Sequence, residues 1–260
     1  MPRLCANLSM MFKEVPFLDR FAAAGRAGFE GVEFLFPYDH AAGEIKARLD
    51  DAGLKQVLFN APPGDWAAGE RGTAGLPGRQ AEFRDGVHRA LDYAGALDAG
   101  MVHVMAGIPS ATLRPGVAQA TYVANLAWAA EQAAGRGVLL VVEPINHRDM
   151  PGYLLNTMGQ GAAVVEALGR ERVGLQFDVY HCQVTEGDVT RRMESLMPVI
   201  AHMQVADVPD RHEPGTGEIG WEHVFGAMDR FGYSGWVGCE YRPAGDTVTG
   251  LDWRARYLSK

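Results

Sequence analysis

Short runs of apolar residues recur along the whole chain and alternate with longer stretches of mixed polarity. Each run is rich in Val, Leu, Ile, Phe or Met and has turn residues near its ends. Continuous apolar runs of this kind are typical of strands in a parallel sheet that is buried on both faces. The pattern predicts strands at residues 4–8, 31–36, 55–60, 101–106, 138–143, 173–179, 200–206 and 235–241.

The stretches between these runs repeat their apolar residues at helical spacing. Gly169 and Gly232 directly follow two of the stretches, at the position where a left-handed helix cap favours glycine. The pattern predicts helices at residues 17–27, 80–99, 116–134, 159–168 and 221–231, with weaker ones at 39–51 and 188–196.

Repeated alternation of strand and helix indicates parallel strands that are joined by helices. Eight such units in 260 residues match the size of a closed β/α barrel. We therefore predict an α/β fold, a single (β/α)8 TIM barrel that spans residues 1–260 as one domain. An open doubly wound sheet is the alternative, although no Gly-rich dinucleotide turn follows an early strand. Two long loops, at residues 61–78 and 207–219, have the length of functional loops.

Charge and composition exclude several classes of function. The formal net charge is −8, from 24 Lys and Arg against 32 Asp and Glu, and no block of basic residues occurs. Binding to nucleic acid or to an anionic membrane surface needs such a basic stripe, so neither partner is expected. We find no apolar stretch of membrane-spanning length and no secretory signal. Three widely spaced cysteines favour a reducing cytoplasm over a disulfide framework.

Four of the later predicted strands end on a side chain that can bind a metal. The runs VVE, QFD, HMQ and GCE end at Glu143, Asp178, Gln204 and Glu240. Strand ends meet at one mouth of a barrel, so these oxygen donors would converge there. Neighbouring carboxylates stay ionised together only when a cation holds them, and oxygen donors select Mg²⁺ or Mn²⁺. The pattern predicts a divalent-metal site, while for any single residue a helix cap or a solvated loop remains the alternative.

Other side chains near these strand ends could contact a bound substrate. His181 follows the second of the four site strands, and Arg71, Arg211 and His212 come from the two long loops. An arginine suits a bidentate grip on a substrate carboxylate. Each of these residues is also consistent with an ordinary helix start or a solvated loop.

Longer segments of the chain resemble a known family. They read ANLSMMF at residues 6–12, GVEFLFPYD at 31–39, GDWAAGERG at 64–72, PGR at 77–79, EFRDGV at 82–87, EPINH at 143–147, HEPGTGEI at 212–219 and GWVGCEY at 235–241. The chain resembles the hydroxypyruvate isomerases, within the xylose-isomerase-like group that includes ketose 3-epimerases and apurinic-site endonucleases. The opening residues 1–24, the strand VHVMAG and the loop PDRHEP resemble the 2-oxo-tetronate isomerases instead.

The resemblance covers essentially the whole chain and implies both a fold and a site. It implies an eight-stranded β/α barrel with a divalent metal held by Glu143, Asp178, Gln204 and Glu240. The residues that match Glu143 and Glu240 are the family's proton donor and acceptor. Ketose epimerases usually have His where this chain has Gln204, so the glutamine favours the isomerase branch and disfavours a zinc nuclease. Arg211 matches an arginine that the epimerases tend to carry.

These features lead to a hypothesis for the reaction. Hydroxypyruvate and 2-hydroxy-3-oxopropanoate (tartronate semialdehyde) would interconvert by metal-assisted proton transfer through a cis-enediolate. One of Glu143 and Glu240 would remove a proton and a glutamate would return one, with the direction for each left open. The first alternative is a 2-oxo-tetronate isomerase acting on a four-carbon acid. A ketose 3-epimerase, a non-catalytic sugar-acid-binding barrel and a repair nuclease are more remote, and a homo-oligomer stays open.

Overall fold

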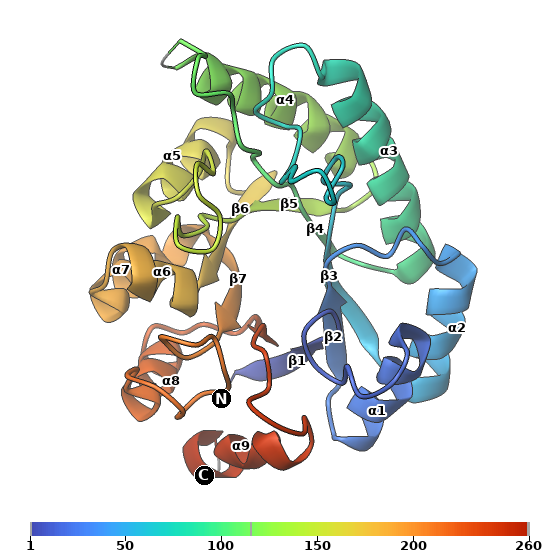
Figure 1. The fold of residues 1–260 in the computed structure, drawn as a ribbon, viewed down its shortest axis with the longest axis vertical. Helices are drawn as coiled ribbons and strands as arrows, with labels where there is room; N and C mark the ends of the chain where they lie inside the picture. The colour runs from blue at the N-terminus through green and yellow to red at the C-terminus, as the bar shows by residue number, and fades with distance from the viewer. Residues whose placement is uncertain (1, 115, 259–260) are drawn as a thin grey trace.

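Parallel strands pair with their neighbours in chain order and close into an eight-stranded barrel in the computed structural model of this chain (Figure 1). The structure describes residues 2–114 and 116–258; Met1, Pro115, Ser259 and Lys260, which the predicted domain of residues 1–260 includes, lie outside the described residues. Strand β8 pairs with β1 and so closes the sheet, which confirms the predicted (β/α)8 TIM barrel. The strands are β1 (Arg3–Asn7), β2 (Gly31–Phe34), β3 (Lys55–Asn60), β4 (Met101–His103), β5 (Leu139–Val142), β6 (Val173–Asp178), β7 (Ile200–Val205) and β8 (Trp236–Cys239).

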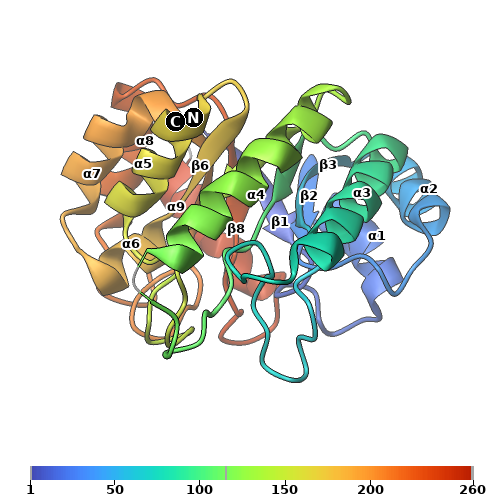
Figure 2. The same ribbon diagram turned by 90° about the horizontal axis from the view of Figure 1, so that it is seen from above.

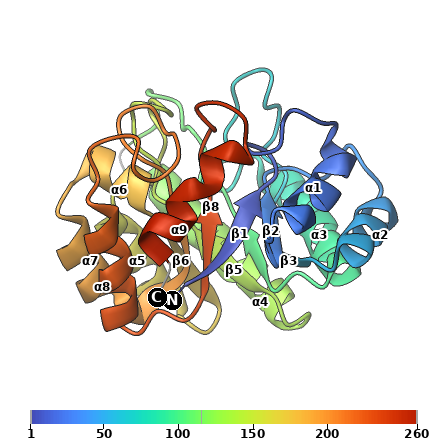
Figure 3. The ribbon, with the colours of Figure 1, turned by 90° about the horizontal axis from the view of Figure 1, so that it is seen from below.

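Helices lie outside the barrel, and long loops gather at one end of it, as Figures 2 and 3 show from opposite sides. Within the described ranges, none of the helices is both long and apolar enough to cross a membrane. The α-helices are α1 (Arg20–Arg26), α2 (Ala42–Ala52), α3 (Gln80–Leu97), α4 (Val117–Ala134), α5 (Met158–Leu168), α6 (Val179–Thr185), α7 (Val189–Leu196), α8 (Trp221–Arg230) and α9 (Trp253–Leu258). Short 3-10 segments are η1 (Phe17–Asp19), η2 (Met197–Val199) and η3 (Thr249–Asp252).

The differences between predicted and observed elements have local causes. Strand β4 ends at His103, before the predicted residue 106: the backbone N–H of Val104 still donates to Val141 of β5 at 3.0 Å, but that of Ala106 donates to the hydroxyl of Tyr153 at 2.8 Å. The helix predicted at residues 17–27 is divided into η1 and α1. Helix α6 was not predicted, because it begins directly after β6 where the predicted strand ran on to residue 179. Helix α9 was also missed.

The interior of the barrel changes character along its axis. Near the amino ends of the strands, the side chains of Cys5, Val57, Leu58 and Val141 pack into a small apolar cluster. Gly31 is needed there, since a Cβ at this position would lie 2.9 Å from the side chains of Val57 and Trp236. Toward the carboxyl ends the buried side chains become polar, and this polar layer holds the candidate site.

Candidate active site

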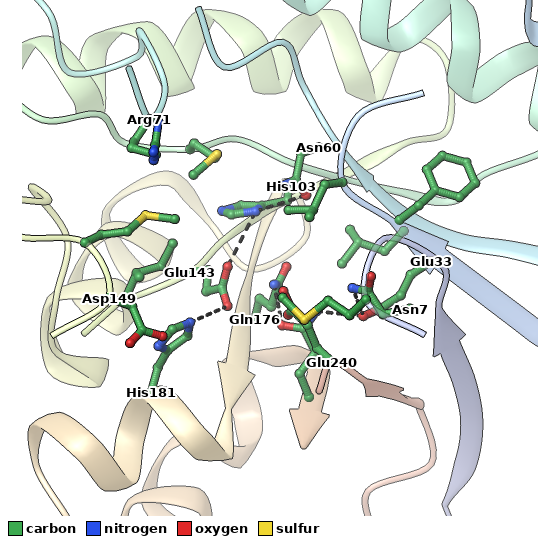
Figure 4. Close-up of a pocket in the computed structure, with 18 of the residues that line it drawn as sticks. Asn7, Glu33, Asn60, Arg71, His103, Glu143, Asp149, Gln176, His181 and Glu240 are labelled. Carbon is green, nitrogen blue, oxygen red and sulfur yellow. Dashed lines mark hydrogen bonds and ion pairs between the residues drawn. The ribbon is translucent and has the colours of Figure 1, made fainter. Parts of the chain in front are cut away.

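The four predicted oxygen donors lie at the carboxyl ends of the last four strands. Glu143 directly follows β5, Asp178 ends β6, Gln204 is next to last in β7, and Glu240 directly follows β8. All four side chains are buried. Glu143, Gln204 and Glu240 line one cavity at the mouth of the barrel (Figure 4), and Asp178 is fully buried beside it.

The three carboxylates of this set lie close together. Single ligand atoms of Glu143, Asp178 and His181 lie within 4.8 Å of one another, so these three side chains could hold one metal ion. Arg211 links the group to β8, because its Nη2 atom is 3.5 Å from Asp178 Oδ2 and 3.4 Å from Glu240 Oε1. The convergence that the sequence pattern predicted is therefore present in the structure for the carboxylates.

Electrostatics make this group of carboxylates unfavourable without a cation. Burial raises the pKa of Glu143 well above its ordinary range, and the nearby Glu240 and Asp178 raise it further. Burial also raises the pKa of Glu240 to about 8 and that of Asp178 to about 6, although Arg211 opposes both shifts. Buried carboxylates therefore keep a proton unless a positive charge compensates them.

Each carboxylate also has an oxygen without a hydrogen-bond donor. Among the described residues, Glu143 Oε1, Asp178 Oδ2 and Glu240 Oε2 are buried and unpartnered. A buried acceptor without a partner costs free energy. Three such oxygens at one mouth fit a hard divalent cation, which takes carboxylate oxygen as its preferred ligand.

Asp178 combines two roles that the sequence could not separate. Its Oδ1 atom accepts a hydrogen bond from the backbone N–H of Tyr180 at 2.7 Å and so caps α6. Its other oxygen, Oδ2, accepts no hydrogen bond from the described residues and lies 3.5 Å from Arg211 Nη2. Capping fixes the carboxylate in place, so the cap and the metal ligand are compatible functions of one side chain.

Two histidines flank Glu143 and are held neutral. Its Oε2 atom is 3.6 Å from His103 Nδ1, and its Oε1 atom is 3.8 Å from His181 Nε2. Burial lowers the pKa of His103 to about 3, and burial together with Arg211 lowers the pKa of His181 well below its ordinary value. Neutral imidazoles add no charge to compensate the carboxylates, so that task is left to Arg211 or to a bound cation.

The loop at residues 207–219 carries Arg211 and is braced by Asp207. The Asp207 carboxylate accepts hydrogen bonds from the backbone N–H groups of Val208, Gly215, Gly217 and Ile219, and from Trp221 Nε1. Arg211 itself adopts a left-handed backbone conformation, with φ of 60°. Its guanidinium also pairs with Asp149, at 3.2 Å. The bonds to Asp207 thus help to hold the positively charged guanidinium of Arg211 against the carboxylates.

The loop at residues 61–78 brings Arg71 and Trp66 to the cavity mouth. The Arg71 guanidinium lies 3.8 Å from the centre of the Trp66 ring, and its Nη1 donates to the backbone oxygens of Trp66 and Glu70. Gly72 has φ of 110°, and a Cβ there would lie 2.3 Å from the backbone oxygen of Met105. Only glycine therefore lets this loop pack so closely over the segment after β4.

The remaining predicted contact, His212, is not among the residues that line the cavity. Its Nδ1 atom lies 2.7 Å from the backbone oxygen of Arg242. Sequence reasoning missed several polar residues that do line the cavity. Their signal was a polar residue within or at the end of an apolar run, or in the loop that follows it: Asn7, Glu33, Asn60, His103, Asp149, Gln176 and Arg242.

Comparisons with known proteins agree with this architecture. The family model for the xylose isomerase-like TIM barrel matches residues 21–257. Over the full length of both chains, 54% of residues are identical to a 2-oxo-tetronate isomerase of Cupriavidus necator. A hydroxypyruvate isomerase of Escherichia coli is 45% identical, covering 99% of this chain and 100% of the relative. A crystal structure titled AP endonuclease, family 2, from Brucella melitensis superimposes with a TM-score of 0.96 at 49% identity, covering 99% of each chain.

Proposed function

The chain belongs to the xylose isomerase-like TIM barrel family, and we propose on that premise that it is a sugar-acid isomerase. The reaction we propose interconverts hydroxypyruvate and 2-hydroxy-3-oxopropanoate. Two relatives, the 2-oxo-tetronate isomerase at 54% identity and the hydroxypyruvate isomerase at 45% identity, are both named as isomerases of short oxo acids. The proposed substrate is therefore a small acid that carries a carbonyl next to a hydroxyl-bearing carbon.

The observation that carries this proposal is the pair of buried glutamates at one cavity. Isomerisation removes a proton from C3 of hydroxypyruvate, adds one to C2, and shifts the hydroxyl proton between the two oxygens. A group that both takes and gives protons works best when its pKa is near the ambient pH. Burial raises the pKa of Glu240 to about 8 and raises that of Glu143 as well. We assign the proton transfers to Glu143 and Glu240, because both carboxylates are buried and line the same cavity.

We propose Mg²⁺ or Mn²⁺ as the cofactor. Glu143, Asp178, Gln204 and Glu240 would hold the ion, because three of them have buried unpartnered oxygens and all four are oxygen donors. When bound, such an ion stabilises negative charge that develops on the substrate oxygens. Arg211 already contacts two of these carboxylates and lowers their mutual repulsion.

Arg71 is our first choice to bind the substrate carboxylate. It lines the cavity mouth, and among the described residues its Nη1 donates to two backbone oxygens while its Nη2 has no hydrogen-bond partner. Arg211 is already paired with Asp149, Asp178 and Glu240. The substrate contacts predicted for His181, Arg211 and His212 stay predictions.

A 2-oxo-tetronate isomerase is the second candidate function. It is favoured by the higher identity, 54% against 45%, to a relative of that name. The two candidates differ by one hydroxyl-bearing carbon in the substrate and share the same chemistry. The test is kcat/KM for both acids, measured side by side with Mg²⁺ or Mn²⁺ present. A strong preference for the four-carbon acid would replace the first candidate by the second.

Proton transfer itself is tested by running the reaction in D₂O. Transfer through an ionisable glutamate introduces solvent deuterium at the carbon that receives the proton, which NMR of the product detects. No deuterium in the product, together with normal turnover of Glu143→Gln and Glu240→Gln, would overturn the assignment. Absence of turnover on any short oxo acid would favour the non-catalytic binding barrel.

We also propose the cellular compartment of the protein and its binding partner. Cys5, Cys182 and Cys239 are free and buried, which supports a reducing compartment such as the cytoplasm. The proposed partner is a small oxo acid, with no nucleic acid or membrane surface expected. Fractionation of cells and size-exclusion chromatography test the compartment and the open question of a homo-oligomer.

A further inference from the structure

Glu33, on β2, is a buried carboxylate that the proposed chemistry does not use. Its side chain is 1% exposed and lies inside the barrel near Asn7 and Glu240 (Figure 4). One oxygen, Oε1, accepts from Asn7 Nδ2 at 3.1 Å and from Gln204 Nε2 at 2.8 Å. The other, Oε2, accepts from His202 Nε2 at 2.7 Å and from the Cys5 thiol at 3.5 Å. The carboxylate thus joins β1, β2 and β7 across the barrel.

This contact determines which way the amide of Gln204 faces. A carboxylate only accepts hydrogen bonds, so the NH₂ group of Gln204 must point toward Glu33. The amide oxygen then points the other way, where it accepts from Gln176 Nε2 at 2.6 Å. A carbonyl oxygen has two lone pairs, so one remains after the bond from Gln176. That lone pair is what a hard cation needs from Gln204.

The opposite strand is shaped to admit Glu33. A Cβ at Gly238, on β8, would lie 2.4 Å from Glu33 Oε1 and 2.5 Å from Oε2. A larger residue at this position would therefore force the Glu33 carboxylate to shift. Gly238 lies two residues before Glu240, so the strand that carries a proposed catalytic glutamate also makes room for Glu33.

The same side chains could instead form a metal site of their own. Single atoms of Cys5, Glu33 and His202 lie within 4.8 Å of one another. However, Glu33 already accepts a bond from each of the other two, and a metal ion would have to replace both bonds. Burial and Glu33 also raise the pKa of Cys5 well above its ordinary value, which agrees with a protonated thiol that donates to Glu33.

We propose that Glu33 is a positioning residue that fixes the amide of Gln204 with its oxygen toward the cation. The inference rests on the proposed divalent-metal site and adds a residue that the ligand set does not contain. A glutamine that could rotate freely would present its NH₂ group to the cation part of the time. Glu33 removes that orientation, and Gln176 supports the remaining one from the other side.

The first test is a double-mutant cycle on metal-free protein. Gln204→Glu places two carboxylates in contact, and we expect a lower melting temperature. The double variant Glu33→Gln, Gln204→Glu exchanges carboxylate and amide, so a donor again faces an acceptor. We expect the exchange to recover about half or more of the loss in melting temperature, as coupled neighbours do. An exchange variant no more stable than Gln204→Glu would overturn the inference.

The second test measures binding of Mn²⁺ to the same proteins, with free Mn²⁺ followed by electron paramagnetic resonance. We expect Glu33→Gln to raise the Kd for Mn²⁺ about tenfold or more, as loss of a residue that orients a metal ligand does. Glu30→Gln, at an exposed position just before β2, is the matched control and should bind as the wild type does. A role limited to folding would lower the melting temperature of Glu33→Gln but leave this Kd unchanged, and that result would overturn the inference.

The two tests also separate this inference from the proposed metal site. Wild-type protein that binds no Mn²⁺ would contradict the metal site, and the metal-free cycle would still decide whether Glu33 orients Gln204. Wild-type protein that binds Mn²⁺, with no rescue in the exchange variant, would leave the metal site in place and overturn the role of Glu33.

Discussion

The two halves of the barrel contribute polar residues to the same cavity in different ways. In the late half, Glu143, Asp178 and Glu240 each keep a buried oxygen without a donor. In the early half no carboxylate oxygen of the described residues is left in this way: Asn7 donates to Glu33, and His103 Nδ1 lies 3.3 Å from Asn60 Oδ1, although the other ring nitrogen of His103 has no partner. The comparison teaches that the late strands carry the groups for chemistry, and the early strands carry groups that hold them in place.

The strongest way to break this comparison is to neutralise the late glutamates. We expect Glu143→Gln and Glu240→Gln to lower kcat/KM by about 10²–10⁴, the contribution that a positioned acid or base makes to a proton transfer. The change is nearly isosteric, so circular dichroism and melting temperature should stay close to wild type. The matched control is Glu166→Gln, at an exposed position of α5, which should retain full activity. Normal turnover in either site variant would remove that glutamate from the chemistry.

Removal of divalent metal should have the next largest effect. Dialysis against a chelator is expected to lower kcat about a hundredfold, since a bound ion supplies several kcal/mol of charge stabilisation. Added Mg²⁺ or Mn²⁺ should restore activity, and it should also raise the melting temperature because the ion binds the folded state. The rise should be absent in Asp178→Asn, which lacks one of the clustered carboxylates. Full activity after chelation would contradict the proposed cofactor.

The next prediction concerns His103, in the early half, where we expect a smaller effect on activity. Its Nδ1 atom lies 3.6 Å from Glu143 Oε2 and 3.3 Å from Asn60 Oδ1, which places the imidazole between the two halves. We expect His103→Asn to lower kcat about tenfold with little change in metal binding, as a residue beside a catalytic group does. The measurement is kcat together with the Kd for Mn²⁺. A loss as large as that of Glu143→Gln would make His103 part of the chemistry and would remove the distinction between the halves.

The same comparison explains how far the sequence could be interpreted. All strands and most helices followed from runs of apolar residues, because each run is a local pattern. The late donors could be found because each stands at the end of such a run. Helix α6 was missed because its seven residues are too few to show a helical period. For Asp178 the sequence offered a helix cap as the alternative to a metal ligand, and the structure shows that cap.

Glu33 could not be found in this way. It lies inside the apolar run GVEFLF, where nothing local shows whether it faces into the barrel. Its partners His202 and Gln204 lie 169 and 171 residues away in the chain. Such pairs exist only after the barrel closes, so a single sequence does not reveal them. The loop contacts of Arg211 and His212 are non-local in the same sense, since both depend on how residues 207–219 fold.

The smallest predicted effect concerns Arg71, which lies at the mouth of the cavity in the loop at residues 61–78. If Arg71 binds the substrate carboxylate, Arg71→Lys should raise KM about tenfold or less and leave kcat nearly unchanged, because it removes binding shared by substrate and transition state. The chain offers a matched control: the Arg84 guanidinium also stacks on a tryptophan, 5.0 Å from the centre of the Trp128 ring, and neither residue lines the cavity. Arg84→Lys should leave both constants unchanged. Equal effects of the two substitutions would assign Arg71 to packing on Trp66, and a change in kcat alone would place it with the groups that act on the reacting carbons.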